Sequence, residues 1–206
     1  MQTSYFAQRK SAQDIIYSKG FYAFLCGAVL IGALLGTLSL CLGQESALSD
    51  ITAVGRRFIM QRKGMDDAAV LTGSLGSATL LLGAQLVFGL CAVGQPVAAA
   101  VPVFRGMGIG LTLAQLYTQA GKSGVLPAMG LILPSEVICV LALIAGAREA
   151  AAMSCEILSH TLAERQVEGL AEQTKLYLTR FMVLEACLAL SAAADCAANH
   201  FLIGYF

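Results

Sequence analysis

Long apolar stretches alternate with short polar ones along the whole chain. Five apolar stretches, at residues 21–43, 70–93, 97–120, 125–147 and 181–203, each reach the length of about 20 residues that a helix needs to cross a bilayer. The pattern predicts an all-α, polytopic membrane helical bundle of about five transmembrane helices, with amphipathic connecting helices. We expect a single integral membrane domain over residues 1–206, with its two ends on opposite sides of the membrane.

The polar stretches predict surface segments between the spans. Residues 1–20 read as a tail along the membrane surface, and 148–179 as charged, amphipathic helix broken near Gly169. In the loop 44–70, apolar side chains recur at helical spacing, at Leu48, Ile51, Gly55 and Phe58. This spacing suits an amphipathic helix on the membrane or a partner, and equally a solvated connector packed on its own bundle.

Glycine and proline interrupt the stretch 94–146, whereas a simple transmembrane span needs no such residues. Tight turns are expected at 94–96 and at 120–124. Pro134 suits the first turn of a helix that restarts there, which would place the Glu136 carboxylate at a positive helix N-terminus. In the first span, the Gly32-x-x-x-Gly36 spacing would let another helix approach closely.

Composition supports the membrane assignment and limits the partners. The chain is 57% hydrophobic and only 13% charged, with a mean hydropathy of +0.74, far from the balance of soluble domains. Its formal net charge is zero and no basic run occurs, so nucleic acid is not an expected partner and membrane lipid is. The seven cysteines are scattered, mostly through apolar stretches, and predict neither a disulfide framework nor a metal site.

Charged side chains inside apolar spans are the candidate functional positions, because each is costly there unless it is paired. Arg105 lies close to the start of its expected span, where its side chain could snorkel to the interface. In the last span, Glu185, Asp195 and Asn199 share one helical face, which should turn inward, towards Arg105 or another subunit. That face reads either as a polar pathway or partner-binding seam, or as a hydrogen-bonded staple between helices.

Three kinds of enzyme site fail on their spacing, so no catalytic residue and no cofactor is predicted. The sequence Gly121-Lys122-Ser123 ends like a P-loop, but Leu116 stands where the first glycine is required. The same turn has the G-x-S-G form of rhomboid-type intramembrane proteases, yet the only histidines, His160 and His200, lie far along the chain. Two histidines forty residues apart also make no metal motif.

The positive-inside rule favours a cytoplasmic N-terminus. In that orientation the inner side carries Arg9, Lys10, Lys19, Arg105, Arg148, Arg165, Lys175 and Arg180. The outer side carries Arg56, Arg57, Arg62, Lys63 and Lys122.

The stretch 94–146 resembles the stage II sporulation protein M family of endospore-forming bacteria. The matching residues are Gly94-x-Pro96, Arg105-Gly106, Gly110-x-Thr112, Gln119-x-Gly121-x-Ser123-Gly124, Leu133-Pro134, Leu141-Ala142 and Gly146, preceded by Tyr22-x-Phe24 and Gln44-Glu45. The resemblance implies a non-enzymatic protein of the mother-cell membrane that acts in engulfment. It also implies a scaffold that gathers the peptidoglycan hydrolases called stage II sporulation proteins D and P at the septum.

Two hypotheses follow from the sequence. In the first, helix faces and the outer loop recruit partner proteins, and the chain is a scaffold. In the second, interrupted helices around Arg105, Pro134 and Glu136 build the site of a transporter or permease-like subunit. The sequence leaves open whether the chain forms a homo-oligomer.

Overall fold

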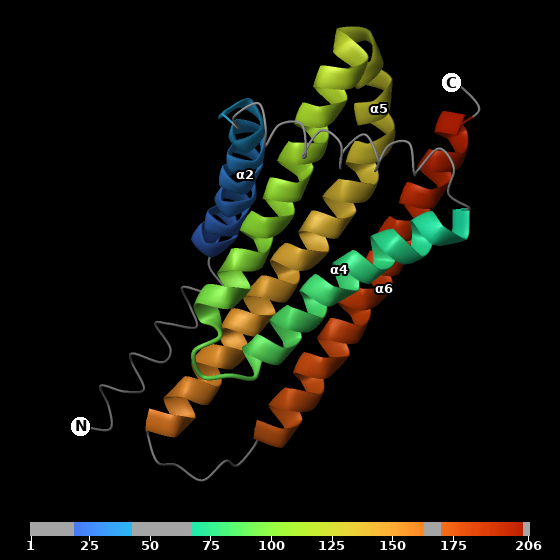
Figure 1. The fold of residues 1–206 in the computed structure, drawn as a ribbon. Helices are drawn as coiled ribbons and strands as arrows, with labels where there is room; N and C mark the ends of the chain where they lie inside the picture. The colour runs from blue at the N-terminus through green and yellow to red at the C-terminus, as the bar shows by residue number, and fades with distance from the viewer. Residues whose placement is uncertain (1–18, 43–66, 163–169, 204–206) are drawn as a thin grey trace.

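The structure is a bundle of long helices. The computed structural model describes residues 19–42, 67–162 and 170–203, and Figure 1 shows their arrangement. Every described helix is long: α2 spans Lys19–Leu42, α4 Asp67–Gly89, α5 Gln95–Leu162 and α6 Leu170–Ile203. The predicted loop helix at 44–66 and the break near Gly169 lie outside the described residues.

Helix α5 folds back on itself and supplies two of the membrane-spanning limbs. A straight helix would hold Arg105 and Glu136 about 46 Å apart, because each residue advances it by 1.5 Å. The two side chains are in contact, so the chain reverses between them, as Figure 1 shows. We call Gln95–Ala114 the first limb and Leu133–Leu158 the second limb.

Five segments are long and apolar enough to cross a membrane, which confirms the predicted number. They are Lys19–Ser39 in α2, Leu71–Gly89 in α4, the two limbs of α5, and Glu172–Ala197 in α6. Two local expectations differ from the structure: the turn before α5 occupies residues 90–94 rather than 94–96, and no helix starts at Pro134 because α5 runs through it. The predicted reversal between the third and fourth spans is present, although residues 120–124, where a tight turn was expected, are helical.

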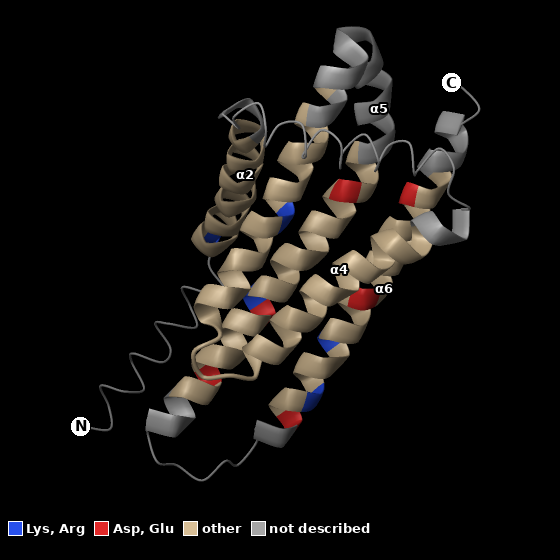
Figure 2. Ribbon diagram, viewed as in Figure 1, with Lys and Arg blue, Asp and Glu red and all other residues tan. Residues whose placement is uncertain are grey.

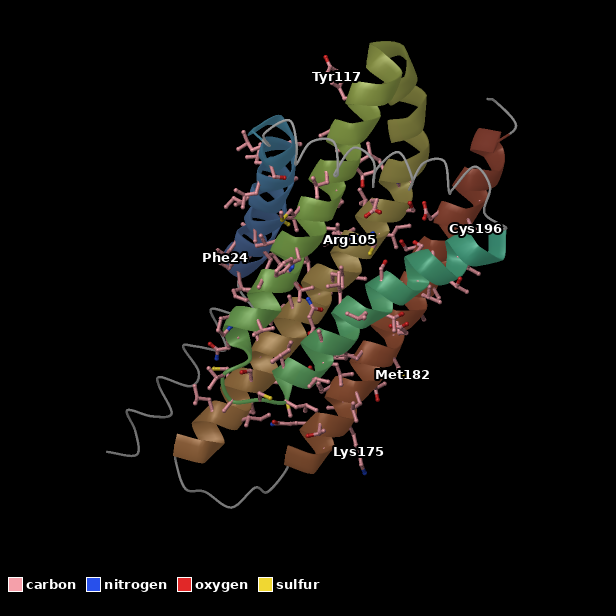
Figure 3. The ribbon with its side chains drawn as sticks, viewed as in Figure 1. Phe24, Arg105, Tyr117, Lys175, Met182 and Cys196 are labelled. Carbon is pink, nitrogen blue, oxygen red and sulfur yellow. The ribbon has the colours of Figure 1, made fainter. Side chains whose placement is uncertain are left out.

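The second limb lies at the centre of the bundle and the other segments surround it. One apolar core, which includes Leu82, Leu143, Phe181 and Leu188, joins α4, the second limb and α6. A smaller one joins α2 to the same limb through Leu25, Ile144 and Ala147. Phe24 and Met182 project outward, 60% and 72% exposed, and such apolar surface suits contact with lipid tails (Figure 3).

Helices α2 and α5 cross in parallel through glycine on both sides. A Cβ atom added to Gly32 would lie 2.1 Å from the Val103 carbonyl oxygen, and one added to Gly36 would lie 2.3 Å from that of Met107. In return, Gly106 faces the carbonyl of Val29 and Gly110 that of Ala33, both at 2.1 Å from the added Cβ. The expected close approach at Gly32 and Gly36 is therefore present, and its partner is a second G-x-x-x-G pair in the first limb.

Candidate functional site

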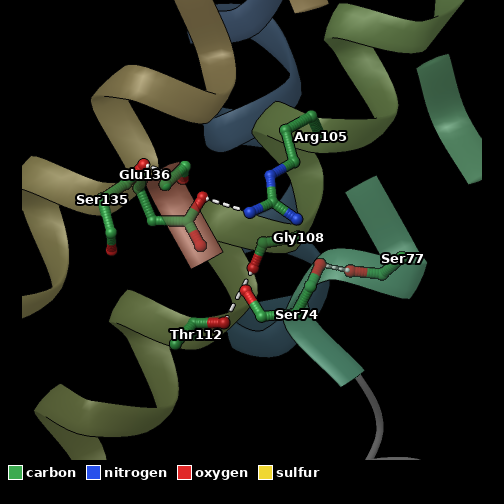
Figure 4. Close-up of polar contacts among 8 residues, drawn as sticks. Ser74, Ser77, Arg105, Gly108, Thr112, Ser135 and Glu136 are labelled. Atoms are coloured by element: carbon green, nitrogen blue, oxygen red, sulfur yellow. Dashed lines mark hydrogen bonds and ion pairs between the residues drawn. The ribbon is translucent and has the colours of Figure 1, made fainter. Parts of the chain in front are cut away.

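An ion pair within the bundle joins the two limbs of α5. The Nη2 atom of Arg105 donates to Oε2 of Glu136 across 2.6 Å, as the close-up in Figure 4 shows. Arg105 stands ten residues after Gln95, the start of the first limb, and Glu136 stands three residues after Leu133, the start of the second. The pair therefore lies within the spans of both limbs, with the Arg105 guanidinium directed to Glu136.

The fold explains why both charges are tolerated within the spans. One unpaired charged side chain in the middle of a membrane helix costs about 2.5–3.5 kcal/mol on insertion scales. Pairing offsets that cost, and both side chains are mostly shielded, at 19% and 26% exposed. Glu136 is held by a guanidinium from the neighbouring limb, not by a helix N-terminus, since α5 is continuous through Pro134.

Asp195 lies on the same side of the bundle as this pair. Cys139, one turn after Glu136, is buried. One turn before Asp195, the Ser191 hydroxyl donates to the Ser135 carbonyl oxygen across 2.7 Å. Asp195, only 6% exposed, thus faces inward, as the periodicity of α6 predicted.

Glu185 is separated from Asp195, although the two were expected to share a face. It accepts a hydrogen bond from the Thr79 hydroxyl of α4, at a partly exposed edge where α4 and α6 meet. The polar face of α6 therefore divides into an inward carboxylate and an edge carboxylate. Asn199 belongs to α6, but its side chain lies outside the described residues, as do those of Ser123, His160 and His200.

A second group of charges, which the sequence reading missed, joins three helices at the other end of the bundle. Arg148 donates to the Tyr22 hydroxyl of α2 and pairs with Glu149, which also pairs with Arg180 of α6. Its guanidinium lies 5.2 Å from the centre of the Tyr22 ring, within the range of a cation–π contact. Arg148 is twelve residues, or about 18 Å, along the second limb from Glu136, which places this group at the level where α2 begins.

Three buried polar side chains fasten the end of α4 to its neighbours. Gln85 donates through Nε2 to the Leu143 carbonyl oxygen at 3.1 Å, and the Tyr177 hydroxyl donates to that of Leu86 at 3.0 Å. Ser154 donates to the Cys91 carbonyl oxygen at 2.8 Å and accepts from the Gly94 amide at 3.1 Å. The Ser154 bonds hold the short connection between α4 and α5 against the second limb, and the other two join the end of α4 to the second limb and to α6.

These charged and polar groups form ion pairs and hydrogen bonds that join the helices to one another. Figure 2 shows that charged positions are sparse on the described helices. No group of three or more His, Cys, Asp or Glu within 19–42, 67–162 and 170–203 is placed to hold a metal ion.

Comparison with known proteins gives one match. A family model described as stage II sporulation protein M matches residues 21–195, which include every predicted span except the end of the last. Searches of curated proteins and of solved structures gave no match.

Proposed function

Because this chain belongs to the stage II sporulation protein M family, and is thus a sporulation-related integral membrane protein, we propose that it is a non-enzymatic scaffold for engulfment. In this role it recruits peptidoglycan hydrolases, stage II sporulation proteins D and P, and positions them at the septal membrane of the mother cell. The observation that carries the proposal is the family match over residues 21–195, which covers all or most of each of the five spans.

The structure supports the proposal through the way its polar groups are used. The intramembrane charges Arg105 and Glu136 pair with one another. Gln85 and Tyr177 bond to backbone groups of neighbouring helices, and Ser154 bonds to the turn between α4 and α5. Side chains so employed stabilise a rigid bundle, and a rigid bundle can present fixed surfaces to partner proteins. The proposal places the N-terminus in the cytoplasm, by the charge distribution.

Crosslinking in sporulating cells tests the scaffold. A photoreactive residue in the loop 44–70 should capture the two hydrolases during engulfment, whereas one at Phe24, on the apolar outer face of α2, serves as a control. Deletion should leave the hydrolases dispersed in the membrane and stop engulfment. Normal engulfment after deletion, with no hydrolase captured, would contradict the proposal.

A second candidate function, a transporter or permease-like subunit, is favoured by one observation. Arg105 and Glu136 pair between the two limbs, and Asp195 lies on the same side of the bundle, so three charged groups within the spans lie near one another, as in the substrate sites of many carriers. Water accessibility separates the two functions. Rapid modification of a cysteine placed at Glu136 by a membrane-impermeant thiol reagent would favour transport, and protection of that cysteine favours the scaffold. The comparison requires the same reagent to modify a control cysteine at exposed Lys175.

A further inference from the structure

Glu185 places a carboxylate at mid-bilayer depth on the edge of the bundle. It lies thirteen residues after Glu172 and twelve before Ala197, the ends of its span. Thr79, which donates to it, lies eight residues after Leu71 and ten before Gly89 in its own span. Both residues are therefore near the centre of the membrane, about as far from water as a span allows.

This carboxylate has no counter-charge in the part of the chain that the structure describes. Glu136 pairs with Arg105, and Glu149 pairs with Arg148 and Arg180. Within residues 19–42, 67–162 and 170–203, Glu185 receives a hydrogen bond only from the Thr79 hydroxyl, and Thr79 itself is exposed. Intramembrane charges usually pair with one another or with other polar groups, so a cation from outside the described residues would complete this site.

The surface around Glu185 also leaves room for close approach by a helix. Gly76 and Gly83 flank Thr79 at spacings of three and four residues, which puts all three on one face of α4. A Cβ atom added to either glycine would meet nothing within 4 Å, in contrast to Gly32, Gly36, Gly106 and Gly110, which are filled by the crossing of α2 and α5. On α6, Met182 stands one turn before Glu185 and is 72% exposed. We call Gly76, Thr79, Gly83, Met182 and Glu185 the Glu185 strip.

We propose that the Glu185 strip binds a transmembrane helix of a partner protein that carries a lysine or arginine near its middle. The basic side chain pairs with the Glu185 carboxylate, and the open glycines of α4 let the two backbones come close. A second copy of this chain joined symmetrically by the same strip is disfavoured, because it would bring two Glu185 carboxylates together. The inference rests on the proposed scaffold function and names the chemistry of one partner.

Model transmembrane helices test the proposal with the full chain in phosphatidylethanolamine and phosphatidylglycerol vesicles. The probes are labelled Leu/Ala helices with a central Lys, Gln or Leu, and energy transfer to the labelled protein reports binding. The Lys probe should bind about tenfold more tightly than the Leu probe, the scale of one strong polar contact between membrane helices. Glu185→Gln should remove this preference, and Glu185→Asp, which keeps the charge, should retain most of it.

Matched variants separate the strip from general effects on the bundle. Gly83→Leu should weaken binding of the Lys probe, whereas Gly27→Leu should not, although Gly27 is equally open on α2. Glu172→Gln, at the exposed start of α6, should also leave binding unchanged. Circular dichroism of each variant establishes that it has folded.

Three results would overturn the proposal. The first is equal binding of all probes to the unaltered chain, and the second is a preference for the Lys probe that survives Glu185→Gln. The third is energy transfer between labelled copies of the chain that Gly83→Leu abolishes. The last result would assign the strip to self-association. Failure of the hydrolase crosslinking while the Lys probe still binds would contradict the scaffold function alone. Successful crosslinking without any probe preference would contradict only the role of the Glu185 strip.

Discussion

The parallel crossing of α2 and α5 makes opposite predictions for two glycines that are two residues apart. In Gly106→Ala the new methyl carbon would start 2.1 Å from the Val29 carbonyl oxygen, and that neighbour is backbone. In Gly108→Ala it would meet nothing within 4 Å. Both changes are chemically identical and lie in the same helix, so differences in helix propensity cancel between them.

The structure gives the size of the expected effect. A carbon and a carbonyl oxygen sit about 3.3–3.6 Å apart in a close interhelical contact, so the crossing must open by about 1.2 Å at Gly106. Overpacking of this kind costs about 1–3 kcal/mol. Alanine in place of glycine within a helix stabilises by about 0.5–1 kcal/mol, and Gly108→Ala should gain part of this amount. The two variants should therefore differ in sign.

The free energy of unfolding, measured by titrating the purified protein in mixed micelles with dodecyl sulfate, gives the comparison. Gly27→Ala, on the open side of α2, should behave like Gly108→Ala, and Gly32→Ala should behave like Gly106→Ala. The double variant of Gly32 and Gly106 should cost less than the sum of the single changes, because one opening of the crossing accommodates both methyl groups. A Gly106→Ala protein as stable as Gly108→Ala would refute the close crossing.

Three further outcomes are expected in the same unfolding assay. Glu136→Leu should destabilise by about 3 kcal/mol because Arg105 cannot lose its charge, and Arg105→Leu should cost less because Glu136 can take up a proton. The double change should restore most of the stability that Glu136→Leu loses, and equal stabilities for all three variants would contradict the ion pair. Tyr177→Phe should cost about 1 kcal/mol through loss of its bond to the end of α4, and no change would show that this hydroxyl stabilises nothing. Ser154→Ala should cost about 1 kcal/mol through loss of the hydroxyl's bonds to the Cys91 carbonyl oxygen and the Gly94 amide, and that amide keeps its bond to the Cys91 carbonyl oxygen. Ser154→Thr, which keeps the hydroxyl, should cost less, and equal stabilities of the two variants would contradict a role for these bonds.

The number of spans and the charged residues within them could be predicted from the sequence. Apolar length alone predicts a five-span bundle, and the rule that intramembrane charges matter singles out Arg105 and Glu136. The contact between those two residues was not predictable. The turn expected at 120–124 would bring the two spans side by side, but the register that sets Arg105 against Glu136 depends on how the limbs pack.

Other features were missed for physical reasons that differ. Periodicity puts Glu185 and Asp195 on one face, but α6 touches both α4 and α5, so one face meets two environments. Arg148 and Glu149 begin a charged stretch that looked like a surface connector, whereas α5 continues through it to Leu162. The interhelical hydrogen bond of Gln85 could have been predicted, because Gln85 is an amide in an otherwise apolar part of the second span.

The ion pair between the limbs of α5 has a consequence for how the protein enters the membrane. Arg105 leaves the ribosome 31 residues before Glu136, which is a delay of a few seconds at bacterial rates of synthesis. Inserted alone, the first limb would expose an uncompensated guanidinium to lipid. We therefore expect the insertion machinery to retain this limb until the second limb emerges and to release the two together as a helical hairpin. In Glu136→Leu the second limb has no carboxylate to pair with Arg105, so the first limb should be held at the translocon for longer.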